Sequence, residues 1–413
     1  MRPYWLLALA LSAASVNACS AEVTDDSFDD EEAATRDPNA AQMNDLTIVA
    51  PLPKSAKEVD SYMAATTVGR GGALLPKSIV GAMVPDADGP LNPGRDVSMT
   101  YPSLRVVGIR FDPCFANVGP ITKPESCDNQ IRLIFQSIAS TKDGGTAIDG
   151  AVHAFYRVTR AELTSAIQEV VALRKANSTG SLGALAAHPI LVKQGMGGAF
   201  SVGLAKIIEK YAGAKNLMRF TVFQSANLQT VWNFSGFDVS GNKLTPMVIP
   251  TLPSKGVTQG FFAGFAAPMS GGFTPETTSK DDVALLTNPS KAQAATPTQR
   301  KAAFDASLRI VNPNFHSPNT IDCAGCHVAQ DARVLVGEGK LGLSADGNVN
   351  AFAADPKFVS KTMMKQTTSP TKQQGINVHM MSYRNTNLLI GDRVINETAS
   401  VLAYVNGTIL AKR

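Results

Sequence analysis

The five residues Cys323-Ala324-Gly325-Cys326-His327 constrain this chain most, because they confine two thiols and an imidazole to adjacent positions. A Cys-x-x-Cys-His pattern is typical of the covalent attachment of c-type haem. In that chemistry the two thiols add to the haem vinyl groups, and the histidine that follows binds the iron. We therefore expect one haem c, with Cys323 and Cys326 as covalent anchors and His327 as the proximal iron ligand.

The first residues have the pattern of a secretory signal. Arg2 precedes a short apolar run at 5–11 and mostly small residues at 12–18, too short for a spanning helix. The segment Val16-Asn17-Ala18-Cys19 resembles a bacterial lipobox, which implies acylation of Cys19. Ser20, rather than aspartate, follows, and by the same resemblance this favours the outer membrane of a Gram-negative bacterium. Because Asn17 departs from the commonest lipobox residues, ordinary cleavage near Ala18 stays open.

Composition after residues 1–19 predicts a tether and then a globular body. Residues 20–45 have few large apolar side chains and concentrate acidic ones, so we expect a disordered leash. The acidic residues are Asp25, Asp26, Asp29, Asp30, Glu31 and Glu32. The rest of the chain is correspondingly more basic, which is typical of a solvated lysine-rich surface. No nucleic-acid motif occurs, so the expected partners are the membrane, through the lipid anchor, and a redox protein.

Two further cysteines, Cys114 and Cys127, flank a short loop that contains glycine and proline. In an exported chain we expect them to form a structural disulfide, because the compartment is oxidising. Closing a loop of this size would contribute about 3 kcal/mol in the chain-entropy model.

Residues 46–253 predict an α+β domain with an antiparallel or mixed sheet that has one covered face. Thr159 and Glu162 form a capping box at the start of a predicted helix. Catalytic motifs are absent, and we interpret the lone His153 and His188 as structural. Strands are expected at 104–111, 131–138, 147–158, 217–223 and 230–239, and a second helix at 200–212. Residues 254–295 are rich in glycine and proline and predict a linker or long loop, in which phenylalanines indicate local packing.

Residues 296–413 predict a small all-α domain. Thr296 and Pro297 open a helix before the motif, and an amphipathic helix follows at 393–406. This layout resembles class I c-type cytochromes, in which the first and last helices cross beside the haem. The sequence departs from that family in its proline-rich approach to Cys323 and in lacking a proline-flanked distal methionine.

The sixth iron ligand is therefore chosen on position alone. The cytochrome resemblance places it between the motif and the last helix, where Met363, Met364 and a His-Met-Met cluster occur. We expect Met380 or Met381, with His379 as the alternative. A thioether ligand raises the reduction potential, whereas a second imidazole lowers it.

These patterns predict an anchored monohaem cytochrome that transfers single electrons, rather than a catalyst. The alternative is a surface or periplasmic lipoprotein for binding or adhesion, in which Cys323 and Cys326 form a structural disulfide. A zinc site made of His316, Cys323, Cys326 and His327 is a further alternative, which the irregular spacing of these residues disfavours. A thioredoxin-like site would need the motif at a helix start beside a βαβ sheet.

Overall fold

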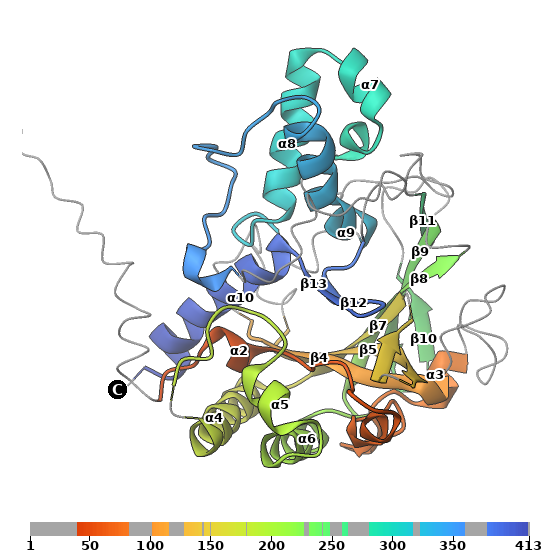
Figure 1. The fold of residues 1–413 in the computed structure, drawn as a ribbon, viewed down its shortest axis with the longest axis vertical. Helices are drawn as coiled ribbons and strands as arrows, with labels where there is room; N and C mark the ends of the chain where they lie inside the picture. Colours follow the sequence, from red (N-terminus) through yellow and green to blue (C-terminus); the bar gives the residue numbers. More distant parts are fainter. Residues whose placement is uncertain are drawn as a thin grey trace, which may run out of the picture.

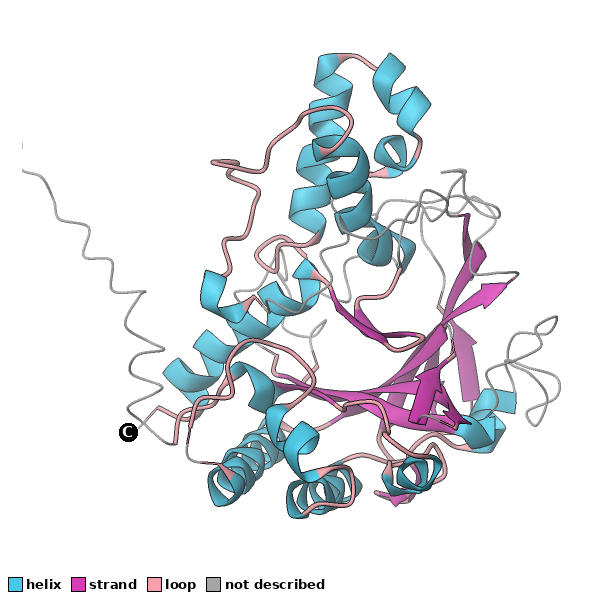
Figure 2. Ribbon diagram, viewed as in Figure 1, coloured by secondary structure: helices cyan, strands magenta, loops and turns pink. Residues whose placement is uncertain are grey.

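A large antiparallel sheet with helices on both faces dominates the fold of this computed structural model (Figures 1 and 2). The structure describes residues 39–81, 101–114, 128–142, 144–148, 150–178, 180–226, 231–241, 243–247, 258–262, 281–316, 323–359 and 378–411. The antiparallel sheet with several helices agrees with the α+β class expected from the sequence.

Within the described residues the large sheet has nine strands, in the order β1-β4-β5-β7-β8-β9-β10, with β6 paired to β5 and β11 to β9. The strands are β1 Thr47–Val49, β4 Leu104–Asp112, β5 Gln130–Thr141, β6 Gly144–Ala147, β7 Gly150–Arg157, β8 Leu217–Ala226, β9 Val231–Ser240, β10 Lys243–Pro246 and β11 Thr258–Phe262. A small pair, β2 Val68–Gly69 and β3 Gly72–Ala73, lies apart from it. All five strand segments expected between 104 and 239 are present.

The expectation of one covered face is wrong for the central strands. Nearly every residue of β4, and the first nine of β5, is buried, so both faces of these strands are covered. The sequence shows this as near-continuous apolar runs, which are typical of strands without a solvent face.

Helices α4 (Arg160–Asn177), α5 (Pro189–Gln194) and α6 (Ala199–Tyr211) lie on one face of the sheet (Figure 1). The predicted capping box begins α4: Thr159 Oγ1 accepts from the Glu162 amide, and the Glu162 carboxylate accepts from the Thr159 amide. A mainly apolar cavity of about 220 Å³ lies between α5, α6 and the sheet, lined among others by Ile48, Ile109 and Leu204.

The opposite face is covered by α9 (Cys323–Ala332), α10 (Asp392–Tyr404) and the hairpin β12–β13 (Figure 1). The hairpin strands are Met381–Arg384 and Asn387–Ile390. Asn385 opens their two-residue turn with φ +54°, a left-handed conformation that asparagine tolerates. The C-terminal third is therefore not all-α, because this hairpin interrupts it.

The remaining α-helices of the described residues are α8 and three short ones. Helix α8 (Pro297–Ile310) begins with a capping box of Thr296 and Gln299, so the predicted start is confirmed. Arg393 and Asn396 of α10 donate to the Ile310 and Val311 carbonyls, which joins the ends of α8 and α10. The short helices are α2 (Met43–Leu46), α3 (Lys77–Gly81) and α7 (Pro289–Ala294).

The hydrophobic core runs without a break from the sheet into the C-terminal elements. Residues 39–45, expected to end the tether, are placed in the structure, and Met43, Asn44 and Asp45 are buried. The expected linker contributes β11 to the sheet and contains α7; the rest of it up to residue 280 lies outside the described residues. No helix in the described ranges combines the length and apolar character needed to cross a bilayer.

Candidate haem-attachment site

The Cys-x-x-Cys-His motif forms the first turns of α9. Cys323 is the first residue of the helix, and Cys326 lies three positions later, so both thiols project from one side of it. Both side chains are half-buried, and neither is part of a disulfide. The pairing that the alternative interpretation requires is therefore not formed in this structure.

His327 is held in one orientation by the backbone. Its Nδ1–H donates to the Val378 carbonyl at 2.5 Å, which leaves Nε2 with its lone pair. Burial lowers the pKa of His327 to about 4, with a smaller contribution from nearby His379, although the bond to Val378 opposes this shift. A neutral imidazole whose Nδ1–H is bonded to a carbonyl is the arrangement that metal-ligating histidines adopt.

Two aromatic side chains of the sheet pack against the His327 ring. Phe223 of β8 and Phe234 of β9 are each 5.3 Å from it, centroid to centroid, and both are buried. They pair across adjacent strands and so lie on the same sheet face. The imidazole is thus placed against an apolar wall that would exclude water from a ligand bound there.

His153 of β7 also faces the motif, which the sequence interpretation missed. Its ring centroid lies 6.2 Å from that of His327, at an interplanar angle of 44°. Burial lowers the pKa of His153 well below its ordinary value, and His327, Arg132 and Arg110 add to this. The sequence signal that could have revealed this position is a histidine inside a predicted strand whose neighbouring residues are apolar on both faces.

Beside the motif lies a buried network of arginines and carboxylates from three elements. Arg110 Nη2 is 2.9 Å from Asp112 Oδ1, and Arg110 Nη1 is 2.8 Å from Glu397 Oε2. Arg132 Nη2 lies 3.0 Å from Asp112 Oδ2, without hydrogen-bond geometry. Arg393 binds Glu397 from the same helix. The network therefore holds one more guanidinium than carboxylate.

This network lies close enough to Cys326 for the sulfur to act on it electrostatically. Burial lowers the pKa of Arg132, and Arg110 adds to the effect, while Asp112 opposes it. Burial would also lower the pKa of Arg110. There, however, Asp112, Glu397 and Cys326 outweigh burial, so the pKa of Arg110 is raised. Among the residues that the structure describes, Arg110 Nε and Arg132 Nε are buried without a hydrogen-bond partner. An anionic group beside Cys326 would satisfy these donors and balance the charge.

The expected distal ligands lie in or beside the hairpin. Met380 packs against Gly391, where a Cβ would lie 2.6 Å from its sulfur, and Met381 packs its methyl group against Gly108 of β4. His379 Nδ1 bonds Ser382 Oγ at 2.8 Å, and its ring meets the edge of Phe223 at 5.2 Å. Met363 and Met364 lie outside the described residues.

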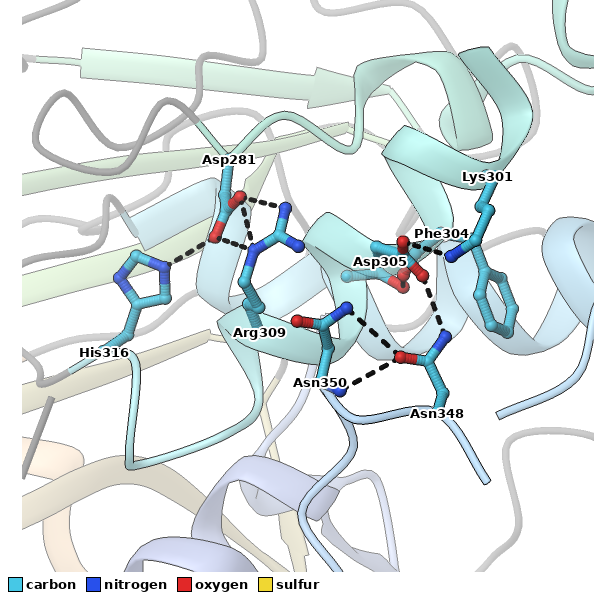
Figure 3. A network of polar contacts seen from close by, with 9 residues as sticks. Asp281, Lys301, Phe304, Asp305, Arg309, His316, Asn348 and Asn350 are labelled. Carbon is cyan, nitrogen blue, oxygen red and sulfur yellow. Dashed lines mark hydrogen bonds and ion pairs between the residues drawn. The ribbon is translucent and has the colours of Figure 1, made fainter. Parts of the chain in front are cut away.

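The zinc alternative does not form. His316 is buried, and its Nε2 lies 3.0 Å from Asp281 Oδ2, which also accepts from Arg309 (Figure 3). Asp281 would have a raised pKa from burial alone, but these two partners lower it. Among the described residues, which include His316 and the motif, no group of three or more His, Cys, Asp or Glu could hold a metal ion.

Only one of the two requirements for a thioredoxin-like site is fulfilled. The motif opens a helix, as such a site requires, but the strand pairs of the described sheet are antiparallel, so the βαβ context is missing. Cys114 is disulfide-bonded; its expected partner Cys127, and Cys19, lie outside the described residues. His188 is buried and stacks on Phe200 at 4.6 Å, away from the motif.

Comparisons with protein-family models, with curated proteins and with solved structures found no match to this chain.

Proposed function

We propose that this chain is a monohaem c-type cytochrome in which Cys323 and Cys326 anchor the haem and His327 binds its iron. The observation that carries the proposal is the state of the motif at the start of α9. Its thiols are not joined to each other, and the His327 Nδ1–H is bonded to the Val378 carbonyl. We expect the two sulfurs to form the thioether bonds and Nε2 to bind the iron of the attached haem.

The surroundings of the motif fit a haem in two ways. Phe223 and Phe234 offer an apolar wall for the macrocycle, and the excess guanidinium charge of the arginine network suits the haem carboxylates. The orphaned Nε atoms of Arg110 and Arg132 are donors that such carboxylates could accept from. When bound, the haem would supply a one-electron change at iron. The protein residues would orient it, exclude water and balance its charge.

Electron transfer is favoured over catalysis, with a redox protein as the unidentified partner. Helices α8 and α10, joined end to end by Arg393 and Asn396, occupy the chain positions of the first and last helices of class I cytochromes. In this chain the sheet would form the other side of the site. It would therefore belong to the haem environment rather than to a separate domain.

We also propose that the protein is exported and lipid-anchored through Cys19 in the outer membrane of a Gram-negative bacterium. The lipobox-like segment 16–19 carries this proposal. A Cys19→Ser variant should move from the membrane to the soluble fraction and keep its haem. Retention of the variant in the membrane fraction would contradict the anchor.

The test of the haem is a pyridine haemochrome assay on protein made in a host with a c-type maturation system. We expect haem that survives denaturing electrophoresis, one lost thioether in each of Cys323→Ser and Cys326→Ser, and no covalent haem in the double variant. His188→Gln, a histidine on the far side of the sheet, is the matched control and should retain the haem. A haem-free wild type, in cells that load their own cytochromes, would leave the binding or adhesion lipoprotein as the better interpretation.

A further inference from the structure

His153 faces the motif from the sheet, and its position is fixed by strand register. It pairs with Ile134 of β5 and Thr221 of β8. Thr221 and Phe223 are alternate residues of β8 and therefore share a face of the sheet. Because His153 pairs with Thr221, it lies on the same side as Phe223, which contacts His327. The ring is half-buried, and within the described ranges neither of its nitrogens has a hydrogen-bond partner.

The separation of the two imidazoles matches a shared metal. A histidine nitrogen binds a transition metal at about 2 Å, so two imidazoles on opposite sides of one ion have centroids roughly 6 Å apart. The His153 and His327 centroids are 6.2 Å apart. Aromatic rings also pack at this distance, but packed polar rings usually find a partner for their nitrogens, and His153 has none in the described chain.

The other candidates are used elsewhere. Met380 packs on Gly391 at the start of α10, and Met381 packs on Gly108 of β4. His379 bonds Ser382 and meets the edge of Phe223, although it also lies near enough to His327 to lower the pKa of that ring. The His153 ring, in contrast, contacts the His327 ring and, in the described part of the chain, has no bond that holds it elsewhere.

We propose that His153 is the second axial ligand of the haem iron, opposite His327. This inference rests on the proposed haem attachment. The sheet would then supply a ligand to a haem anchored on α9, and iron would lie between the two. Two imidazole ligands lower the reduction potential relative to a histidine–methionine pair.

The experiment compares ferric spectra of the holoprotein in variants whose covalent haem is first confirmed by the haemochrome assay. The wild type should be low-spin and should lack the thioether-to-iron charge-transfer band. His153→Ala and His153→Gln should become high-spin, and added imidazole should restore the low-spin form of His153→Ala. His153→Met should gain the thioether band and a higher potential.

Met380→Leu, Met381→Leu and His379→Gln are the matched controls and should keep the wild-type spectrum. The proposal is overturned if His153→Ala and His153→Gln stay low-spin, if a control loses the low-spin form instead, or if the wild type is high-spin. Comparable far-ultraviolet circular dichroism separates ligand loss from misfolding, with His153→Gln as the less disruptive variant. Absence of covalent haem in every protein would defeat the haem assignment itself, and this result is distinct from an unchanged low-spin spectrum.

Discussion

At the scale of single residues, Glu397 is the carboxylate that connects α10 to the sheet. It accepts from Arg110 of β4 and from Arg393 of its own helix. Burial alone would raise its pKa, but Arg393, Arg110 and Arg132 outweigh burial and lower the pKa of Glu397 from 4.5 to about 2. A carboxylate with a lowered pKa stabilises the folded state above its unfolded pKa and loses this effect as the pH falls.

Glu397→Gln should therefore be less stable than the wild type by about 3 kcal/mol near neutral pH. The difference should be full above pH 4.5 and should shrink as the pH falls towards 2. Urea unfolding across this range measures it. The exposed Asp346→Asn is the control and should stay within about 0.5 kcal/mol of the wild type at every pH. If the difference in unfolding free energy between Glu397→Gln and the wild type does not change with pH, the ionisation of Glu397 plays no part in stability.

Arg132 provides the second prediction at this scale. A buried positive charge near the iron favours the reduced haem, because reduction adds an electron. Arg132→Gln should lower the reduction potential, as measured by spectroelectrochemical titration. Arg157→Gln, which removes an exposed partner of Asp128, should leave the potential unchanged. An unchanged or raised potential in Arg132→Gln would place this network away from the haem.

At the scale of elements, the hairpin β12–β13 is joined to the sheet by a few hydrogen bonds, including one from the Ala147 amide of β6 to the Asn385 carbonyl. Gln136 of β5 accepts from the Tyr383 amide at 2.7 Å and donates to the Tyr383 carbonyl at 2.9 Å, both buried. The Tyr383 hydroxyl donates to the Ala50 carbonyl. The hairpin follows directly on Val378, whose carbonyl orients His327, so the fastening of the hairpin also sets the site.

Gln136→Leu should destabilise the protein by about 3 kcal/mol, because it leaves two buried backbone groups without partners. Tyr383→Phe, which removes a single hydroxyl bond, should cost about 1 kcal/mol. Guanidinium unfolding of the two variants tests the order. Equal stability of Gln136→Leu and the wild type would mean that the two Gln136 bonds do not hold the hairpin.

What the sequence predicts well at this scale is local. The strands between 104 and 239, the capping box at Thr159 and the helix start at Thr296 and Pro297 depend on residues within a few positions, and all are present. The hairpin was missed because its strands are short and pair around an Asn-Thr turn. The position of His153 was missed because it lies 174 residues before His327, and only the sheet register brings the two together. Periodicity carries no information on such contacts.

At the scale of the whole molecule, one core joins the sheet to the C-terminal elements. Both faces of β4 and β5 are covered, one by α4–α6 and the other by the hairpin and α10 (Figure 2). The division into two domains linked by 254–295 rests on the change in composition and stays a prediction. Chemically different segments can also bury their apolar faces against each other, as the shared core shows here.

The holoprotein should therefore unfold in one cooperative transition. Circular dichroism of the sheet and absorbance of the haem should give the same midpoint in guanidinium. A fragment of residues 296–413 made alone should fail to fold, because its hairpin and α10 would expose their apolar faces. Two separate transitions, or a folded and haem-loaded fragment, would restore the independent C-terminal domain.

The most direct test of the central claim is the mass of one tryptic peptide. Cleavage after Arg309 and Arg333 releases residues 310–333, which contain both motif cysteines and His327 and no internal lysine or arginine. From protein matured in a competent host, we expect this peptide to carry the added mass of one haem, with both thiols resistant to alkylation. A peptide lighter by two hydrogens, with its sulfurs joined, or one with two alkylated thiols and no haem, would contradict this expectation.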